Sequence, residues 1–367
     1  MKKIYALLLF VLAHTALYAQ LTESPNGGNK KAMVGERIGI TDVTIHYDRP
    51  GVKGREGKIW GGIVGYGFTD QGFGTSKAAP WRAGANENTT IEFTDDVTIE
   101  GQALPAGKYG FFIAVQPDEC TLIFSKNASS WGSFFYDEKE DALRVKVKPA
   151  VTDKSTEWLT YSFENETANS ATVALTWEKW KIPFTVQVDL IKTQLASFER
   201  ELRSEKGFNW NAWVQAAQFC VANNTNLEEA LQWSDYAITG QFVGQKNFQT
   251  LSAKAAVLNK LNRDAEGNAL MKEALPLGNM NEIHGYARQL LTAKKTKEAF
   301  DIFKMNYDKN PNTFTTNMGL TRGYSATGNY KEALKYAQAA LLQAPDAGNK
   351  TNVQTIIDKL KAEQDIN

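Results

Sequence analysis

The residues between positions 81 and 90 combine more chemically active side chains than a loop requires. Within seven positions the chain places an aromatic ring (Trp81), a fixed cation (Arg82), an amide (Asn86) and a carboxylate (Glu87). A turn needs a glycine and one asparagine, but it does not need the tryptophan, the arginine and the glutamate. This block therefore predicts either a binding surface or a buried polar knot that locks a loop.

A second polar loop lies between positions 47 and 60. It carries the cations Arg49, Lys53 and Arg55, is interrupted by glycines, and leads to Trp60. Guanidinium and ammonium groups on such a loop suit the capture of a carboxylate or a phosphate. A solvated, charged loop is the alternative interpretation.

Aromatic side chains accompany both loops. Trp60, Trp81 and Trp131 are candidates for a platform on which the apolar face of a sugar stacks, and capping of the core by the same rings is the alternative. We therefore expect a small anionic ligand or a sugar. The full set of candidate ligand-binding residues is Arg49, Lys53, Arg55, Trp60, Trp81, Arg82, Asn86, Glu87 and Trp131.

Signals for an enzyme are sparse. Glu87 with Asp48, or with Asp137, would supply the two carboxylates of a glycoside hydrolase. No Gly-x-Ser-x-Gly motif occurs, and no glycine-rich loop leads into a helix. We assign no catalytic residue, expect no cofactor and no metal, and rank an enzyme behind a binding module.

From about residue 41 to residue 190, apolar residues recur with a period of two. Val43, Ile45 and Tyr47 form one such run, and similar runs follow, separated by turn signals. Alternation of this kind is typical of antiparallel strands with one face in a core. About eight short strands predict an all-β, jelly-roll-like sandwich over residues 24–190.

After the strands, the pattern becomes helical and repeats after 34 residues. Glu298-Ala299 recurs as Glu332-Ala333, and Pro311 recurs as Pro345. These features resemble the second helix and terminal proline of tetratricopeptide repeats. Because one helical hairpin cannot bury its apolar face alone, we expect three or four stacked hairpins. Residues 191–367 are thus predicted to form an all-α, tetratricopeptide-like domain that docks a protein partner or serves only as a structural extension.

The N-terminus reads as a secretory signal over residues 1–19. Lys2-Lys3 precede an apolar run, and the segment ends in Ala19. We therefore expect an exported protein in the periplasm or cell envelope, without a transmembrane segment once the signal is removed.

Composition excludes two classes of partner or framework. Lys plus Arg equals Asp plus Glu at 41 each, so the charge gives no footprint for nucleic acid. Cys120 and Cys220 are too few for a disulfide scaffold, and we expect buried, unpaired thiols.

Several short motifs follow one another across residues 24–190. They are Ser24-Pro25 and Trp131-Gly132, Trp177-Glu178, and the segments 38–43, 47–60, 81–87 and 104–109. In chain order they resemble the domain of unknown function 2911 family of exported bacterial proteins. The resemblance implies an exported β-rich domain but no activity, since the family has none assigned. An insertion over residues 67–80 departs from the family pattern and is expected to alter or cover a pocket.

Together these features predict an exported two-domain binding or scaffold module of the bacterial envelope. Its β domain carries a polar and aromatic loop site, and its helical repeat docks a protein. The alternative is a glycan-directed hydrolase that uses Glu87 with a second carboxylate.

Overall fold

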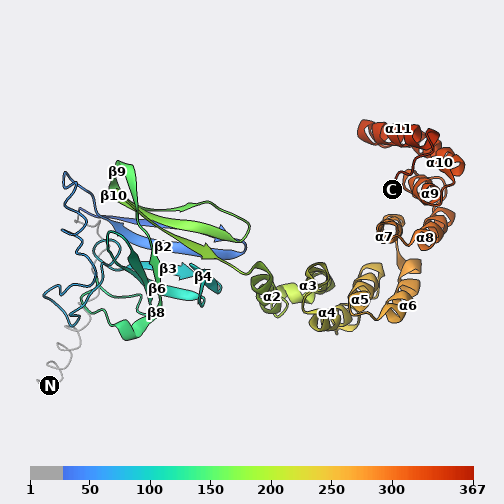
Figure 1. Cartoon of the computed structure of the whole chain (residues 1–367). Coiled ribbons are helices and arrows are strands. Elements are labelled where there is room, and N and C mark those ends of the chain that lie inside the picture. Colours follow the sequence, from blue (N-terminus) through green and yellow to red (C-terminus); the bar gives the residue numbers. More distant parts are fainter. Residues whose placement is uncertain (1–27) are drawn as a thin grey trace, which may run out of the picture. The chain divides into compact units, whose positions relative to one another are not determined.

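The computed structural model describes residues 28–367, so the predicted signal segment and the Ser24-Pro25 motif lie outside the described residues. The chain divides into two compact units, one ending at Gln194 and the other beginning at Leu195. Strands build the first unit and helices build the second (Figure 1).

Two antiparallel sheets form the first unit. The larger sheet has the strand order β1 (Lys30–Ile38), β2 (Thr41–Arg49), β3 (Thr89–Phe93), β6 (Gly107–Ala114), β7 (Cys120–Ser125) and β8 (Asp141–Val147). The smaller sheet has the order β5 (Gln102–Leu104), β4 (Val97–Ile99), β10 (Ser170–Gln187) and β9 (Ala150–Glu164). The long connection between β2 and β3 contains both polar loops that the sequence singled out.

One apolar core draws side chains from both sheets. On β2, Val43 and Ile45 are buried while His46 is exposed, as the alternation predicts. Across the core, the rings of Phe111 on β6 and Phe184 on β10 lie 5.5 Å apart. The predicted antiparallel β unit is confirmed, and the jelly-roll-like sandwich arrangement stays a prediction.

Three strands lack the alternation by which the others were recognised. β1 is an edge strand, paired only with β2, and most of its side chains are not buried. β5 has three residues. β7 is nearly continuous in apolar character because both of its faces are covered, with Ile123 packing on Phe112 and Tyr136 outside the main core. These strands were missed because a period of two arises only where one face is wet.

Strand β10 is a single element, whereas the sequence indicated two strands. Its pairing with β9 shifts register on either side of Glu178, whose φ is 52°. Such a bulge lets the chain bend without leaving the sheet.

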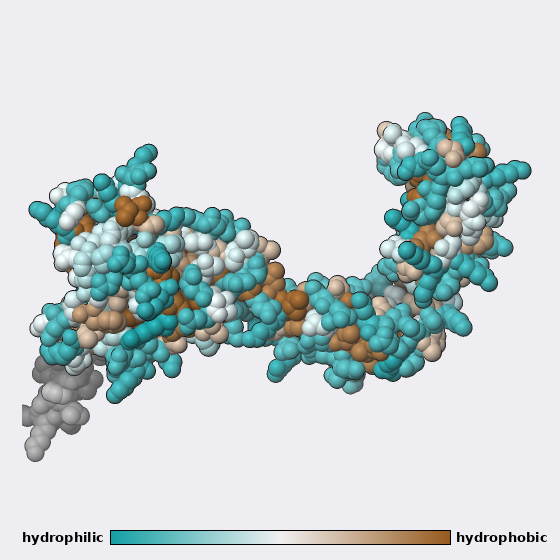
Figure 2. Space-filling view, in the orientation of Figure 1, coloured by the Kyte–Doolittle hydropathy of each residue, from teal (hydrophilic) through white to brown (hydrophobic). Residues whose placement is uncertain are grey.

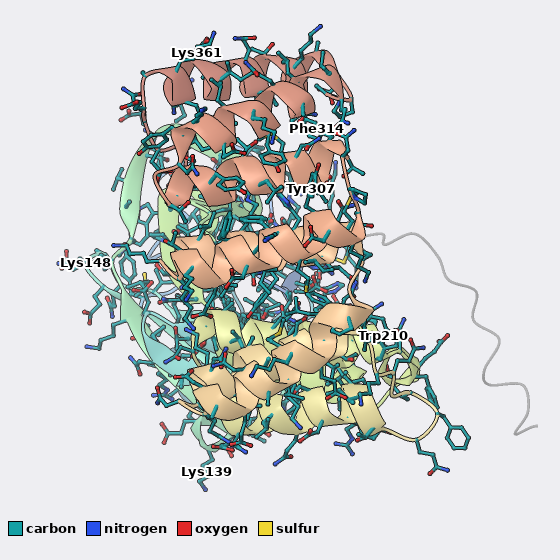
Figure 3. All side chains as sticks on the ribbon, turned by 90° about the vertical axis from the view of Figure 1, so that its right-hand side faces the viewer. Lys139, Lys148, Trp210, Tyr307, Phe314 and Lys361 are labelled. Carbon is teal, nitrogen blue, oxygen red and sulfur yellow. The ribbon has the colours of Figure 1, made fainter. Side chains whose placement is uncertain are left out.

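The second unit consists of paired helices. After one initial helix, consecutive helices pack as four hairpins, and a final helix packs on the last of them (Figures 1 and 3). The helices are α2 (Leu190–Glu201), α3 (Trp210–Asn223), α4 (Leu227–Thr239), α5 (Phe248–Lys260), α6 (Asp264–Ala274), α7 (Met280–Thr292), α8 (Thr296–Lys309), α9 (Phe314–Ala326), α10 (Tyr330–Leu342) and α11 (Ala347–Lys361). The first helices of the hairpins, such as α5 and α7, lie on the inner side of the curve that this unit forms in Figure 1.

The 34-residue repeat has a packing reason. Ala299 on α8 and Ala333 on α10 are fully buried, so each repeat places a small residue where helices meet. At Gly319 on α9, an added Cβ would lie 2.8 Å from the ring of Phe303 on α8. Small residues thus allow close approach of helices, and the predicted helical-repeat unit is confirmed.

Most of the visible surface is hydrophilic, with apolar residues in separate patches (Figure 2). None of the helices in residues 28–367 combines the length and apolar composition needed to cross a bilayer. Cys120 and Cys220 are both buried and unpaired, as predicted.

Candidate functional site

A cavity of about 530 Å³ in the β unit brings together four of the predicted residues. Arg55, Trp81, Arg82 and Asn86 all line it, together with residues that the sequence did not single out as ligands. Those further residues include Asn29, Phe134 and Trp177.

The loop that carries Arg82 is held in place from several sides. The backbone of Trp81 exchanges two hydrogen bonds with Ile113 of β6, at 3.0 and 2.8 Å. The carbonyl of Ala83 is buried and accepts hydrogen bonds from the hydroxyl groups of Thr89 and Tyr161. A site residue on this loop is therefore positioned by the core of the unit.

The Arg82 side chain is partly buried in the cavity wall. Its Nη1 donates to the carbonyl of Asn86 at 2.7 Å, and its guanidinium carbon lies 5.0 Å from the centre of the Phe134 ring. Gly132 makes room for this, since a Cβ there would lie 2.5 Å from that guanidinium carbon. Burial lowers the pKa of Arg82, but a guanidinium remains protonated in proteins.

The cavity is cationic. Arg55 is the second cation in its wall, and no aspartate or glutamate is among the lining residues. Arg55 donates hydrogen bonds to the carbonyls of Val52 and Gly51, and these bonds stabilise the loop that carries Arg55. Arg82 has no carboxylate within 4 Å in the part of the chain that the structure describes. The positive charge of this wall is thus not neutralised by a lining side chain.

Four tryptophans pack together beside the cavity, and two of them, Trp81 and Trp177, line it. Trp81 stacks on Trp177 with ring centres 6.0 Å apart, and Trp60 stacks on Trp180 at 4.9 Å. Trp60 also meets Trp81 edge to face. The indole N–H groups of Trp60 and Trp177 are buried and have no acceptor within residues 28–367. These rings are packed together rather than spread out, and Trp131 lies apart from them with 57% of its surface exposed.

Arg49 and Lys53 do not line this cavity. Arg49 donates to the carbonyl of Leu159 and to the hydroxyl of Thr160, at 2.8 and 2.7 Å, and so ties β2 to β9. Lys53 is exposed, and its backbone N–H donates to the carboxylate of Glu157. The two cations have structural partners or face solvent.

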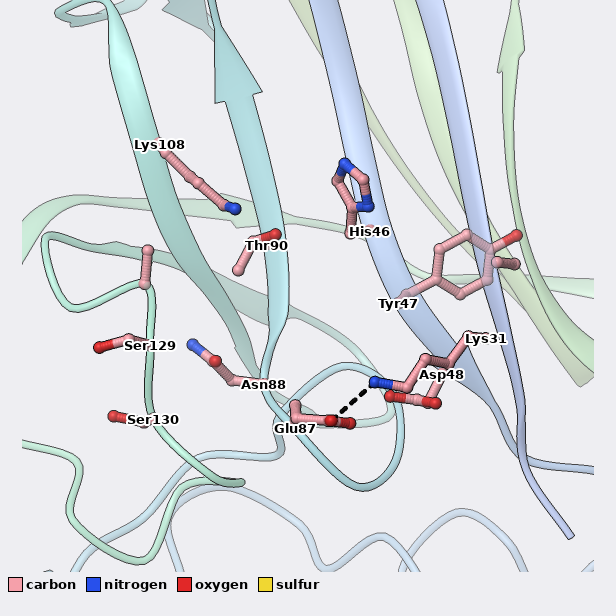
Figure 4. A pocket seen from close by; sticks show the side chains of 12 residues that line it. Lys31, His46, Tyr47, Asp48, Glu87, Asn88, Thr90, Lys108, Ser129 and Ser130 are labelled. Carbon is pink, nitrogen blue, oxygen red and sulfur yellow. Dashed lines mark hydrogen bonds and ion pairs between the residues drawn. The ribbon is translucent and has the colours of Figure 1, made fainter. Parts of the chain in front are cut away.

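Glu87 lines a separate cavity of about 290 Å³. Lys31 of β1 donates to its Oε1 at 2.7 Å, and Asp48 lies beside them (Figure 4). Arg82 and Glu87 therefore face different cavities and do not form an ion pair.

The carboxyl groups of Asp48 and Glu87 line the same cavity and influence each other's pKa. Burial first, and then the neighbouring Glu87 carboxyl group, raises the pKa of Asp48 to about 6, whereas the hydrogen bond from Lys31 lowers the pKa of Glu87. Asp48 Oδ1 and Glu87 Oε2 are buried and have no hydrogen-bond partner within residues 28–367. A single proton shared by the two carboxyl groups would make one of these oxygens a donor and the other an acceptor, so neither would be left without a partner.

A glycoside hydrolase holds its two carboxyl groups roughly 5–10 Å apart, with room for a sugar carbon or a water between them. Asp48 and Glu87 instead interact directly, since each shifts the pKa of the other. Asp137, the other proposed partner of Glu87, caps a 3-10 helix through Lys139 and lines a different cavity. The hydrolase alternative gains no support from either pair.

The insertion at residues 67–80 forms part of two cavity walls. Gly67, Thr69 and Gln71 line the cavity of Arg82, while Phe68 and residues 75–78 line a third cavity of about 600 Å³. Residues of the insertion thus line two cavities, and an effect of the insertion on a pocket stays a prediction. For metals, no group of three His, Cys, Asp or Glu side chains suited to an ion occurs among the described residues.

Several lining residues were not among the candidate ligand-binding residues, and Trp177 and Phe134 are two of them. Trp177 lies in an alternating strand pattern and a family motif, and Phe134 lies in the aromatic run that follows Trp131. Both reach the cavity through pairing of segments far apart in sequence.

The fold and the site together define a β domain with a cationic, aromatic-walled cavity, joined to a unit of helical hairpins. Residues 29–186 match the model of the family described as "Protein of unknown function (DUF2911)". This match confirms the resemblance of the β unit to that family, which was predicted from the sequence.

Solved structures similar to the chain are TPR proteins that match its C-terminal region. YrrB, described as a TPR protein with an unusual peptide-binding site, is 17% identical with a TM-score of 0.30, covering 45% of this chain and 84% of that chain. A tetratricopeptide repeat protein from Parabacteroides merdae is 16% identical with a TM-score of 0.31, covering 47% and 71%. A thermophilic TPR protein from Thermus thermophilus is also 16% identical with a TM-score of 0.31, covering 46% and 91%. No curated protein matches the chain.

Proposed function

We propose that this protein is an exported binding module of the bacterial envelope. Its β unit binds a small organic anion in the cavity of Arg82, and its helical unit docks a protein partner. Export rests on the predicted signal segment at residues 1–19.

One observation carries the ligand class. The cavity wall contains Arg55 and Arg82 and no carboxylate. A partly buried guanidinium is costly without an opposite charge, and its planar fork suits a carboxylate or a sugar acid. Trp81 and Trp177 add an apolar surface, which favours an organic anion over a bare inorganic ion.

Trp177 adds aromatic surface to the cavity wall, whereas its indole N–H is buried and has no acceptor within residues 28–367. The ligand is therefore expected to combine a charged carboxylate with an apolar or aromatic face.

Calorimetry with matched ligand pairs tests this function. Benzoate and glucuronate would be titrated into the purified protein beside their uncharged counterparts, benzamide and glucose. We expect at least one anion to bind and its neutral counterpart to bind about tenfold more weakly or not at all, a difference of about 1.4 kcal/mol.

Two variants of equal charge change locate the binding. Arg82→Gln should abolish anion binding, whereas Arg37→Gln removes an exposed arginine that pairs with Asp42 and should leave it unchanged. Equal binding of neutral and charged ligands, or equal losses in both variants, would contradict the proposal.

A further inference from the structure

Two arginines occupy the same position in consecutive helical repeats. Arg288 on α7 and Arg322 on α9 each lie nine residues after the N-cap of their helix, Asn279 and Thr313 respectively. The two helices pack against each other, so equivalent positions bring the two guanidinium groups to one side of the unit.

These cations are not neutralised by the protein. Burial lowers the pKa of Arg322, and the positive charge of Arg288 lowers it further, while no acidic group raises it. Neither arginine has a carboxylate within 4 Å in residues 28–367. Asp365, in the segment that follows α11, accepts a hydrogen bond from the hydroxyl group of Ser325.

Other cations of the unit show the contrast. Lys254 on α5 pairs with Asp235, and Arg263 pairs with Glu266. Arg322 differs from these cations because it is partly buried without an acidic partner, and Arg288 adds a second positive charge beside it.

His284 fixes the surface between them without adding charge. It packs against Phe303, with ring centres 5.4 Å apart, and its Nδ1 lies 3.3 Å from where a Cβ of Gly319 would be. Burial, with the charges of Arg322 and Arg288, lowers the pKa of His284 to about 4, so the ring is neutral at neutral pH. The positive potential therefore comes from the arginines alone.

We infer that the α7–α9 surface around Arg288 and Arg322 binds an acidic segment of a partner protein. Charge complementarity carries the inference, because two neighbouring guanidinium groups without counter-ions bind carboxylates from an extended chain well. The first helices of stacked hairpins also line the inner curve of this unit, which offers an extended surface (Figure 1). The inference rests on the docking role in the proposed function and names the chemistry of the partner.

Fluorescence anisotropy with a labelled hexaglutamate peptide, an otherwise identical hexaglutamine peptide and citrate tests the inference. We expect only the glutamate peptide to bind, with an affinity that falls steeply as salt is raised. Arg322→Gln and Arg288→Gln should each weaken binding at least tenfold, while Arg263→Gln, the matched control at the N-cap of α6, should not.

The outcomes separate this inference from the proposed function. If the glutamine peptide binds equally well, the partner segment need not be acidic, although the surface still docks a peptide. If citrate binds equally well, the surface is a site for small anions and the inference is wrong. Failure of the glutamate peptide to bind would overturn the inference, while the docking role would still stand for partners of other chemistry. Anion binding by the β unit, measured in the same Arg322→Gln protein, reports separately on the cavity of Arg82. Circular dichroism of each variant would confirm that the helices are intact.

Discussion

The guanidinium group of Arg82 lies over the ring of Phe134, 5.0 Å from the ring centre, although the two residues belong to loops more than fifty positions apart. This contact closes one side of the cavity and holds a cation in its wall. The residues of the polar block at positions 81–87 then divide, with Arg82 and Asn86 at one cavity and Glu87 at the other.

We predict that Arg82→Gln destabilises the protein only modestly, by about 1–2 kcal/mol, because Arg82 has one backbone hydrogen bond and a ring contact but no ion pair. Arg144→Gln is the comparison. It leaves the mostly buried carboxylate of Asp141 without its cation and should cost more, about 3 kcal/mol. Urea unfolding of both variants measures the difference. A loss of about 3–5 kcal/mol in Arg82→Gln would instead make Arg82 part of the scaffold.

Stability should fall as the pH rises through the range of about 4 to 6. Asp48 has a pKa of about 6 in the folded protein, above its unfolded value of about 4, so the folded state binds the additional proton in that range. Because Asp48 and Glu87 influence each other's ionisation and solvent reaches their cavity, we expect the free energy of unfolding to change by only about 1–2 kcal/mol. Glu87, whose pKa is lowered, acts below that range and in the opposite direction.

Asp48→Asn should remove this dependence on pH. An amide cannot ionise, yet it still donates a hydrogen bond to Glu87, so the variant should be more stable than the wild type at pH 8. Urea midpoints between pH 4.5 and 8 provide the measurement. Asp42→Asn, at an exposed ion pair with Arg37, should change the midpoint little. A wild-type slope retained in Asp48→Asn would show that another group titrates.

Two glycines in neighbouring helices should respond oppositely to alanine. Gly319→Ala would place a methyl group 2.8 Å from the Phe303 ring and should destabilise the helical unit by about 1–3 kcal/mol. Gly285→Ala on α7 meets nothing within 4 Å and should stabilise by about 0.5–1 kcal/mol through helix propensity. Thermal unfolding followed by circular dichroism compares them. A stabilising Gly319→Ala would mean that α8 and α9 can separate without cost.

The thiols of Cys120 and Cys220 should be unreactive in the folded protein. Both side chains are fully buried, and burial raises the pKa of each, to about 11 for Cys220. A thiol reagent such as dithionitrobenzoate should therefore react with neither cysteine in native buffer and with both in guanidinium chloride. Rapid reaction of one thiol in native buffer would show local opening around that cysteine.

Local patterns determined much of the architecture. In a strand with one solvent-exposed face, such as β2, apolar residues alternate with polar ones, so the sequence reveals the strand. A helical repeat is revealed in the same way, because it needs small residues at fixed intervals. Where neither condition holds, as in the edge strand β1 and the doubly covered β7, the local pattern carries no such signal.

The site was determined differently. The residue types at positions 81–87 indicated unusual chemistry, but they did not show that Arg82 and Glu87 face separate cavities. That division depends on Phe134, Trp177, Lys31 and Asp48, which come from other loops and strands. Side-chain chemistry is a local property of the sequence, whereas charge balance and burial depend on which distant segments the fold brings together. Only the tertiary structure therefore decided that Arg82 lacks a carboxylate partner and that Arg49 ties two strands together.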